Sequence, residues 1–138
     1  INKNGEAVGY DISDEAIKRA RKACEETKNC TVIKANGNFS EILCEDSSLI
    51  MIDCEGFEYD LLLDNDLNEL SKAALIIEDH YFITGHPRYK LASKLMKEHD
   101  VKIIFASDNS NFLERDLRHP EAQFLICSPK ENCSLAAL

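Results

Sequence analysis

The chain has 138 residues, which suits one domain with a sizeable core. Its composition, 44% hydrophobic and 30% charged residues, is typical of a soluble globular protein. A formal net charge of −9 argues against a surface that neutralises nucleic-acid phosphates and against docking to an anionic membrane. No apolar run approaches the roughly 18 residues that span a bilayer. We therefore expect a small-molecule partner, without nucleic acid or membrane, and nothing in the sequence indicates an oligomeric state.

Residues 7–10 form a short apolar run that ends at Asp11, which predicts a strand. Ser13 is a good helix N-cap, and apolar residues within 16–24 recur at helical spacing. A β-branched run at 31–35 predicts the next strand. The order at the start of the chain is therefore strand, helix, strand.

The Asn-Gly-Asn segment at 36–38 is a strong turn signal. Ser40 could cap a short helix that contains Ile42 and Leu43. Residues 49–52 then form a continuous apolar run, which predicts a parallel strand buried on both faces.

The remainder of the chain continues the alternation of short apolar runs and helical segments. In order, the predicted elements are a helix at about 58–63, a second near 67–70, a strand at 74–77, a loop at 81–87, a helix over 91–99, a strand at 101–106, a polar connection at 107–120, a strand at 122–127 and a loosely ordered tail at 128–138. This alternation predicts one α/β domain over 1–138 with a mainly parallel sheet covered on both faces. The last two strands have no helix between them, so we expect an antiparallel pair at one edge.

Six cysteines are present, but their positions argue against a disulfide framework. No Cys-x-x-Cys pair occurs, Cys54 and Cys127 lie in or beside apolar runs, and Cys24 lies on the apolar side of a predicted helix. Buried free thiols in a reducing compartment are the favoured interpretation. We therefore expect a cytosolic protein.

Polar side chains follow four of the predicted strands. They are Asp11, the turn Asn36-Gly37-Asn38, Asp53 with Glu55, and the run Glu78-Asp79-His80. Ligands of open α/β sheets bind at the carboxyl ends of the strands. A carboxylate there can accept both hydroxyls of a ribose, and an Asn can pair with the edge of a purine. These positions therefore predict a ligand site along one edge of the sheet.

Most of these residues also have a purely structural interpretation. The alternatives are helix capping for Asp11 and Asp53, turn formation for Asn36 and Asn38, a solvated helix position for Glu58, and a hydrogen-bonded loop position for His80. A cation site is a further alternative, because the acids and the histidine after neighbouring strands could meet. No H-x-x-x-H or Cys/His ligand spacing supports it, so no metal is expected.

Three segments of the chain are similar to parts of one known family. Residues 8–13 (VGYDIS) and the helix after them resemble the second strand and following helix of class I S-adenosylmethionine-dependent methyltransferases. Residues 49–58 (LIMIDCEGFE) resemble the D-x-E-G-x-E signature of the FkbM-like branch, and residues 76–80 (IIEDH) resemble its next strand, which commonly ends in E-x-H. The resemblance covers roughly residues 6–127 and implies a Rossmann-like doubly wound fold.

The resemblance also implies a cofactor and a reaction. Asp11, with Ile12 beside it, would bind the ribose of S-adenosylmethionine, and Asn36, Gly37 and Asn38 lie where the family contacts adenine. Asp53 is expected to contact the cofactor and is also a candidate catalytic residue. The reaction implied is O-methylation of a small-molecule hydroxyl, for which the protein must hold donor and acceptor in line.

The reaction needs a base that removes the proton from the acceptor hydroxyl, and the candidate catalytic residues are those that could act as this base. His80 is the first candidate for the base, because the ordinary pKa of histidine lies nearest neutrality. Asp53, Glu55 and Glu78 are the other candidates, and Glu55 and Glu58 could instead organise the loop.

The first strand and the glycine-rich loop of the family have no counterpart in this sequence. Residues 1–5 are similar to the end of the helix that follows that loop, and the chain has no initiator Met. We therefore expect an N-terminally truncated domain whose natural chain begins upstream. A non-catalytic nucleotide-binding or interaction module derived from the same fold is the alternative, because such a module could function without the loop.

Overall fold

The computed structural model describes residues 5–38, 40, 48–105 and 123–130. The chain divides into two compact units, residues 1–43 and 44–138, and each is described by itself. The fold is mixed α/β, with parallel and antiparallel strand pairs. Among the described residues, no helix is long and apolar enough to cross a membrane.

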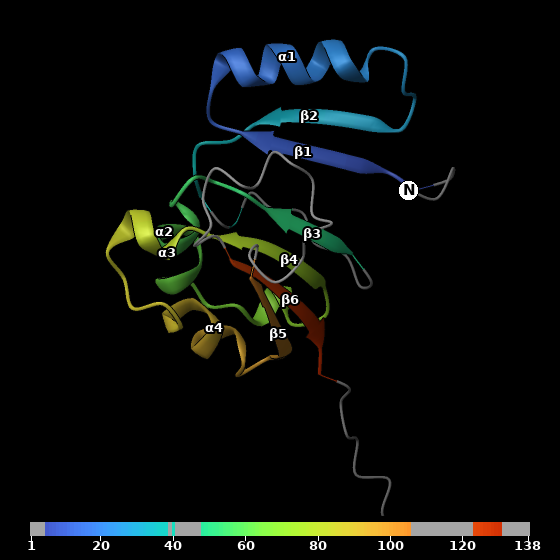
Figure 1. Cartoon of the computed structure of the whole chain (residues 1–138). Coiled ribbons are helices and arrows are strands. Elements are labelled where there is room, and N and C mark those ends of the chain that lie inside the picture. Colours follow the sequence, from blue (N-terminus) through green and yellow to red (C-terminus); the bar gives the residue numbers. More distant parts are fainter. Residues whose placement is uncertain (1–4, 39, 41–47, 106–122, 131–138) are drawn as a thin grey trace, which may run out of the picture. The chain divides into compact units, whose positions relative to one another are not determined.

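The first unit is a strand–helix–strand element, in agreement with the sequence. It consists of β1 (Ala7–Asp11), α1 (Asp14–Cys24) and β2 (Cys30–Lys34). The two strands pair in parallel, with Ala7 opposite Cys30, and Figure 1 shows α1 running alongside the pair. Ser13 caps the helix as predicted, because its Oγ accepts a hydrogen bond from the Ala16 N–H at 3.3 Å.

Two cysteines of this unit contradict the expectation of free thiols. Cys24 ends α1 and Cys30 begins β2, and the pair forms a disulfide with Cα atoms 5.8 Å apart. The chain reverses direction between these elements, which brings two residues only six positions apart into bridging distance. Disulfides persist mainly in oxidising compartments, so this pair does not support a cytosolic location. In the second unit, Cys54 is exposed, contrary to the expected burial, whereas Cys127 is buried and free.

The second unit contains a four-stranded sheet and short helical segments. Its elements are β3 (Leu49–Ile52), α2 (Glu58–Leu63), the 3-10 helix η2 (Asn68–Leu70), β4 (Ala74–Asp79), α3 (Tyr81–Thr84), α4 (Lys90–Leu95), β5 (His99–Phe105) and β6 (Gln123–Pro129). The strand order is β3-β4-β6-β5 (Figure 1). β3 and β4 are parallel, and β6 is antiparallel to both of its neighbours. The predicted antiparallel pair lies at one edge, but the strand that opposes the others, β6, lies inside the sheet.

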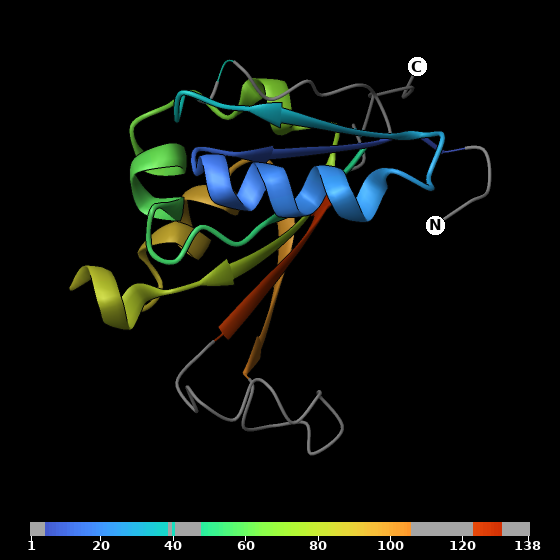
Figure 2. The same ribbon diagram turned by 90° about the horizontal axis from the view of Figure 1, so that it is seen from above.

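Three stretches of this unit differ from their predicted structure. Residues 81–84, predicted as loop, form α3, which follows the carboxyl end of β4 (Figure 2) and ends at Gly85 with a φ of 70°. His99, predicted in a helix, begins β5 because its Nε2 donates to the carbonyl oxygens of Leu70 and Ala73 at 3.1 Å each. Residues 128–129, predicted as tail, belong to β6.

Other predicted features fall on residues that the structure does not describe. They are the helix with Ile42 and Leu43 after Ser40, the connection 107–120, and residues 131–138 of the tail.

The core of the second unit consists of apolar side chains from the sheet and its helices. Those that are 4% exposed or less include Ile52, Leu62, Leu67, Leu70, Leu75, Ile77, Leu91, Leu95 and Leu125. The prediction that β3 is buried on both faces is wrong, because Leu49 and Met51 are 64% and 73% exposed. Among the described strands, β3 has a partner on one side only, which makes it an edge strand.

Candidate functional site

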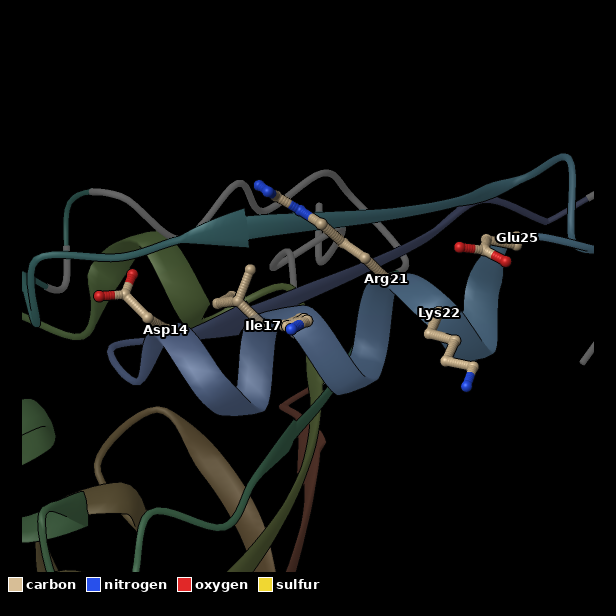
Figure 3. Close-up of a pocket in the computed structure, with 6 residues that line it drawn as sticks. Asp14, Ile17, Arg21, Lys22 and Glu25 are labelled. Carbon is tan, nitrogen blue, oxygen red and sulfur yellow. The ribbon is translucent and has the colours of Figure 1, made fainter.

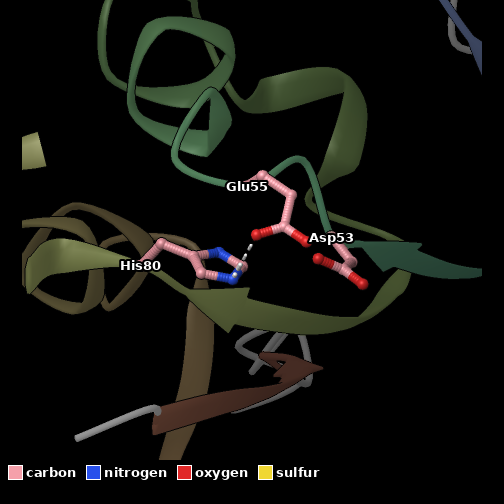
Figure 4. Close-up of side chains that lie close together, drawn as sticks. All are labelled: Asp53, Glu55 and His80. Carbon is pink, nitrogen blue, oxygen red and sulfur yellow. Dashed lines mark ion pairs between the residues drawn. The ribbon is translucent and has the colours of Figure 1, made fainter. Parts of the chain in front are cut away.

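Polar side chains from two neighbouring strand ends meet in the second unit. Asp53 and Glu55 follow β3, and His80 follows β4. The two strands run parallel with Ile52 opposite Ile77, so both chains leave the sheet at the same edge. One ligand atom from each of the three side chains lies within 4.8 Å of the others, and Figure 4 shows them converging. These three residues could hold a metal ion.

Glu58 is a buried carboxylate that connects the two strand ends. Its side chain is fully buried, and it accepts hydrogen bonds from the N–H groups of Cys54 at 2.6 Å and Gly56 at 2.9 Å. Its Oε1 lies 3.1 Å from His80 Nδ1. An ionised carboxylate can only accept a hydrogen bond, so Nδ1 carries the hydrogen and donates. These three donors compensate for removing the carboxylate from water. Glu58 is therefore not a solvated residue, and it fixes the loop 53–56 against His80.

His80 presents one ring nitrogen to the cluster. Its side chain is 5% exposed, and Nδ1 is engaged by Glu58. With the hydrogen on Nδ1, the neutral ring carries its lone pair on Nε2. Nε2 lies 3.6 Å from Glu55 Oε2 and 3.7 Å from Glu78 Oε1, beyond ordinary hydrogen-bond length. His80 is therefore a hydrogen-bonded residue whose second nitrogen faces carboxylates.

The loop between β3 and α2 has an unusual backbone at two consecutive residues. Glu55 has a φ of 53° and Gly56 a φ of 105°. A Cβ on residue 56 would lie 3.3 Å from the Thr84 side chain, so a glycine suits this position for two reasons. The N-cap of α2 is Phe57 and has no side-chain hydrogen bond, so Asp53 does not cap this helix. Asp53 is exposed instead.

A second polar group lies on the other face of β4. Tyr59 donates its hydroxyl to Asp79 Oδ1 at 2.7 Å, and the Gln123 amide donates to Asp79 Oδ2 at 2.6 Å. Burial, followed by the hydrogen bond to the Asp79 carboxylate, raises the pKa of Tyr59 well above its ordinary value. Because side chains alternate between the two faces of a strand, Asp79 lies on the opposite face of β4 from Glu78. Its hydrogen bonds with Tyr59 and Gln123 give Asp79 a structural role.

The predicted cofactor residues of the first unit lie at the carboxyl ends of β1 and β2: Asp11 ends β1, Ile12 follows it, and the turn 36–38 comes after β2. Asp11 Oδ1 accepts from the Ser13 N–H at 2.7 Å, which is the capping role that competed with ligand binding. Asp11 Oδ2 makes no hydrogen bond within the described part of the chain, and the adjacent Ile12 is 61% exposed. The turn 36–38 begins just after Ala35, whose N–H donates to the Asp11 carbonyl at 2.9 Å. Its two asparagines are exposed, and Gly37 has a φ of 80°. Both groups lie at the carboxyl end of the parallel pair.

A shallow hollow of about 380 Å³ runs along α1 (Figure 3). It is lined by Asp14, Ile17, Lys18, Arg21, Lys22 and Glu25. Five of these residues belong to α1 and Glu25 follows it directly; their charged side chains are of both signs, and none of the six is a predicted site residue. We therefore assign no function to this hollow.

The loop-organising role that the sequence allowed for Glu58 is confirmed, but its burial and the part played by Gln123 were not predicted. A usable signal existed for Glu58, because it shares a helix face with the apolar residues Leu61 and Leu62 at helical spacing, which indicates burial. No local signal identifies Gln123, because its contact with Asp79 joins residues 44 positions apart.

No protein-family model matches this chain, and no curated protein matches it. The functional assignment therefore depends on the residues and their geometry.

Proposed function

We propose that the chain is an S-adenosylmethionine-dependent methyltransferase domain of the FkbM-like branch that methylates an oxygen of a small-molecule hydroxyl. The observation that carries the proposal is the contact between the two motifs of the resemblance. Glu58 of the D-x-E-G-x-E segment and His80 of the E-x-H segment, 22 positions apart, lie 3.1 Å from each other. Segments that look unrelated along the chain thus belong to one site.

A Rossmann-like doubly wound fold is part of the same proposal. Two features support it: β1 and β2 form a parallel pair with a helix in their connection, and so do β3 and β4. In both pairs the polar residues follow the carboxyl ends of the strands, where such folds bind their ligands.

The described residues fit a nucleoside-containing cofactor. When bound, S-adenosylmethionine would supply the methyl group. Asp11 keeps one carboxylate oxygen available for ribose hydroxyls, and the exposed Ile12 offers an apolar contact to a base. Asn36 and Asn38 carry the amide groups that can pair with a purine edge. Asp53 is exposed and is assigned to the cofactor as well as to the acceptor.

The acceptor hydroxyl must lose its proton as its oxygen forms the new bond to carbon. His80 Nε2 offers a lone pair at the carboxyl end of β4, and Glu58 prevents the ring from rotating away. The carboxylates of Glu55 and Glu78, 3.6 and 3.7 Å from Nε2, would stabilise the ring once it carries the proton. Asp53 can accept a hydrogen bond from a neighbouring hydroxyl of the acceptor.

Calorimetric titration with S-adenosylhomocysteine, the demethylated product, tests this proposal. We expect saturable binding by the wild-type chain and at least tenfold weaker binding by Asp11→Asn, since a charged acceptor contributes about 1.5–3 kcal/mol per hydrogen bond. The matched control is Asp100→Asn, because Asp100 is an exposed residue at the amino end of β5. A folded chain without binding contradicts the proposal. Binding without methyl transfer to any hydroxyl acceptor favours the non-catalytic module.

A further inference from the structure

We propose that Asp53, Glu55 and His80 bind a divalent transition-metal ion. One ligand atom from each residue lies within 4.8 Å of the others (Figure 4). Atoms on opposite sides of one ion lie about 4–5 Å apart when the metal–ligand bonds measure about 2.0–2.5 Å. The three side chains therefore already have the spacing of ligands that share an ion. This inference does not depend on the proposed function.

The buried imidazole is the observation that distinguishes this cluster from a group of surface acids. The His80 side chain is 5% exposed, and its Nε2 makes no hydrogen bond within the described part of the chain. The carboxylates of Glu55 and Glu78 lie 3.6 and 3.7 Å from this nitrogen. A lone pair and two carboxylates that face one another repel unless a positive group lies among them. A proton on Nε2 would remove this repulsion through the ion pairs with Glu55 and Glu78, whereas a metal ion bound there also gains Asp53 and Glu55 as ligands.

Glu58 gives the cluster the support that metal-binding histidines commonly have. A histidine that binds a metal usually donates its other N–H to a carboxylate or carbonyl, which fixes the ring and strengthens it as a ligand. Here Nδ1 of His80 donates to Glu58, which is fully buried. The same carboxylate accepts from the N–H groups of Cys54 and Gly56 and so holds the loop that carries Asp53 and Glu55. One buried residue therefore orients all three ligands.

The mixture of ligand types indicates which ion is suitable. Carboxylates favour Mg²⁺, Ca²⁺ and Mn²⁺, whereas imidazole favours first-row transition metals. Mn²⁺ satisfies both preferences and is paramagnetic, so it is the probe of choice. Asp53 and Glu55 are exposed, which gives the ion access from solvent. If both proposals hold, the ion occupies His80 Nε2, and Glu78, which is 25% exposed, takes the proton of the acceptor hydroxyl.

Electron paramagnetic resonance of free Mn²⁺, titrated with the whole chain, tests the site. We expect one saturable ion per chain and at least tenfold weaker binding by Glu55→Gln, Asp53→Asn and His80→Asn. Glu69→Gln is the matched control, because Glu69 is an exposed acid of the same unit, and we expect it to bind like wild type. Circular dichroism verifies the fold of each variant. If His80→Asn fails to fold, the two exposed acids carry the test.

Two results overturn the inference. The first is a folded wild-type chain that shows no saturable Mn²⁺ binding up to millimolar concentrations. The second is equal binding by Glu55→Gln and Glu69→Gln, which would indicate unspecific attraction to a chain of net charge −9. Because no cofactor is present in this titration, its failure is separate from failure to bind S-adenosylhomocysteine.

Discussion

Replacing Glu58 by Gln should lower the free energy of unfolding by about 2–4 kcal/mol. The carboxylate accepts three hydrogen bonds, from the N–H groups of Cys54 and Gly56 and from His80 Nδ1. Hydrogen bonds to a charged acceptor contribute about 1.5–3 kcal/mol each, and Gln keeps one acceptor oxygen while directing an NH₂ group at other donors. With the Gln oxygen in the place of Oε1, the bond from Gly56 is lost and the bonds from Cys54 and His80 weaken because their acceptor is no longer charged, for about 3–6 kcal/mol together. Relief from burying a charge offsets part of this loss.

Urea unfolding followed by far-ultraviolet circular dichroism measures this effect, since the chain has no tryptophan to report by fluorescence. With an m-value of about 2 kcal/mol per molar urea, the midpoint should fall by about 1–2 M. Glu69→Gln makes the same chemical change at an exposed site and should alter stability by less than about 0.5 kcal/mol. Equal midpoints for the two variants would refute the role given to Glu58.

Three further predictions concern groups outside the cluster. Burial raises the pKa of Cys127 to about 12 from its ordinary value near 9. The buried neutral thiol therefore stabilises the fold below pH 9, and this contribution to stability is lost as the pH rises toward 12. Alkylation at pH 8.5 should therefore modify the exposed Cys54 and leave native Cys127 intact; equal labelling would contradict the burial. The raised pKa of Tyr59 predicts that one of the four tyrosines ionises only as the protein unfolds in alkali. Absorbance at 295 nm should lose this late step in Tyr59→Phe, and an unchanged curve would argue against it. Peptide mapping without reductant should recover Cys24 linked to Cys30, and Cys30→Ser should cost the first unit about 2 kcal/mol. Recovery of both residues as alkylated thiols would exclude the bridge.

Much of the strand and helix order could be predicted because its signals are local. Ser13 followed by acidic residues marks the start of α1, and the run 74–77 marks β4. The expected single domain over 1–138 stays a prediction. Exposure could not be predicted in the same way, because the apolar run 49–52 looks alike whether or not a neighbour covers it. Leu49 and Met51 lie on the same face of β3 and are 64% and 73% exposed, so the described residues do not cover that face.

Tertiary contacts explain the features that sequence patterns missed. His99 continues a helical pattern, yet its bonds to two backbone carbonyls place it at the start of β5. Cys24 was assigned to an apolar helix face, and its proximity to Cys30 depends on how the chain turns after α1. Predictions from periodicity describe each segment alone, and such long-range or turn-dependent contacts lie beyond them.

The candidate site was partly accessible from the sequence. The rule that ligands bind at the carboxyl ends of parallel strands selected Asp53, Glu55 and His80, which the structure brings together. The absence of a known ligand spacing in the sequence argued against a metal site. Such spacing rules describe ligands on one helix or loop, whereas Asp53, Glu55 and His80 follow two different strands. The sequence allowed Glu58 to organise the loop, whereas its full burial and its bond to His80 became evident only from the structure.

A nucleoside-containing ligand is proposed to bind at the carboxyl ends of β1 and β2. Nuclear magnetic resonance of the ¹⁵N-labelled chain, titrated with S-adenosylhomocysteine, tests that claim residue by residue. We predict saturable shifts of the amide signals of Asp11 and Gly37, with little change along residues 18–25 of α1. Shifts confined to the hollow on α1, or no shifts in a folded chain, would contradict the account.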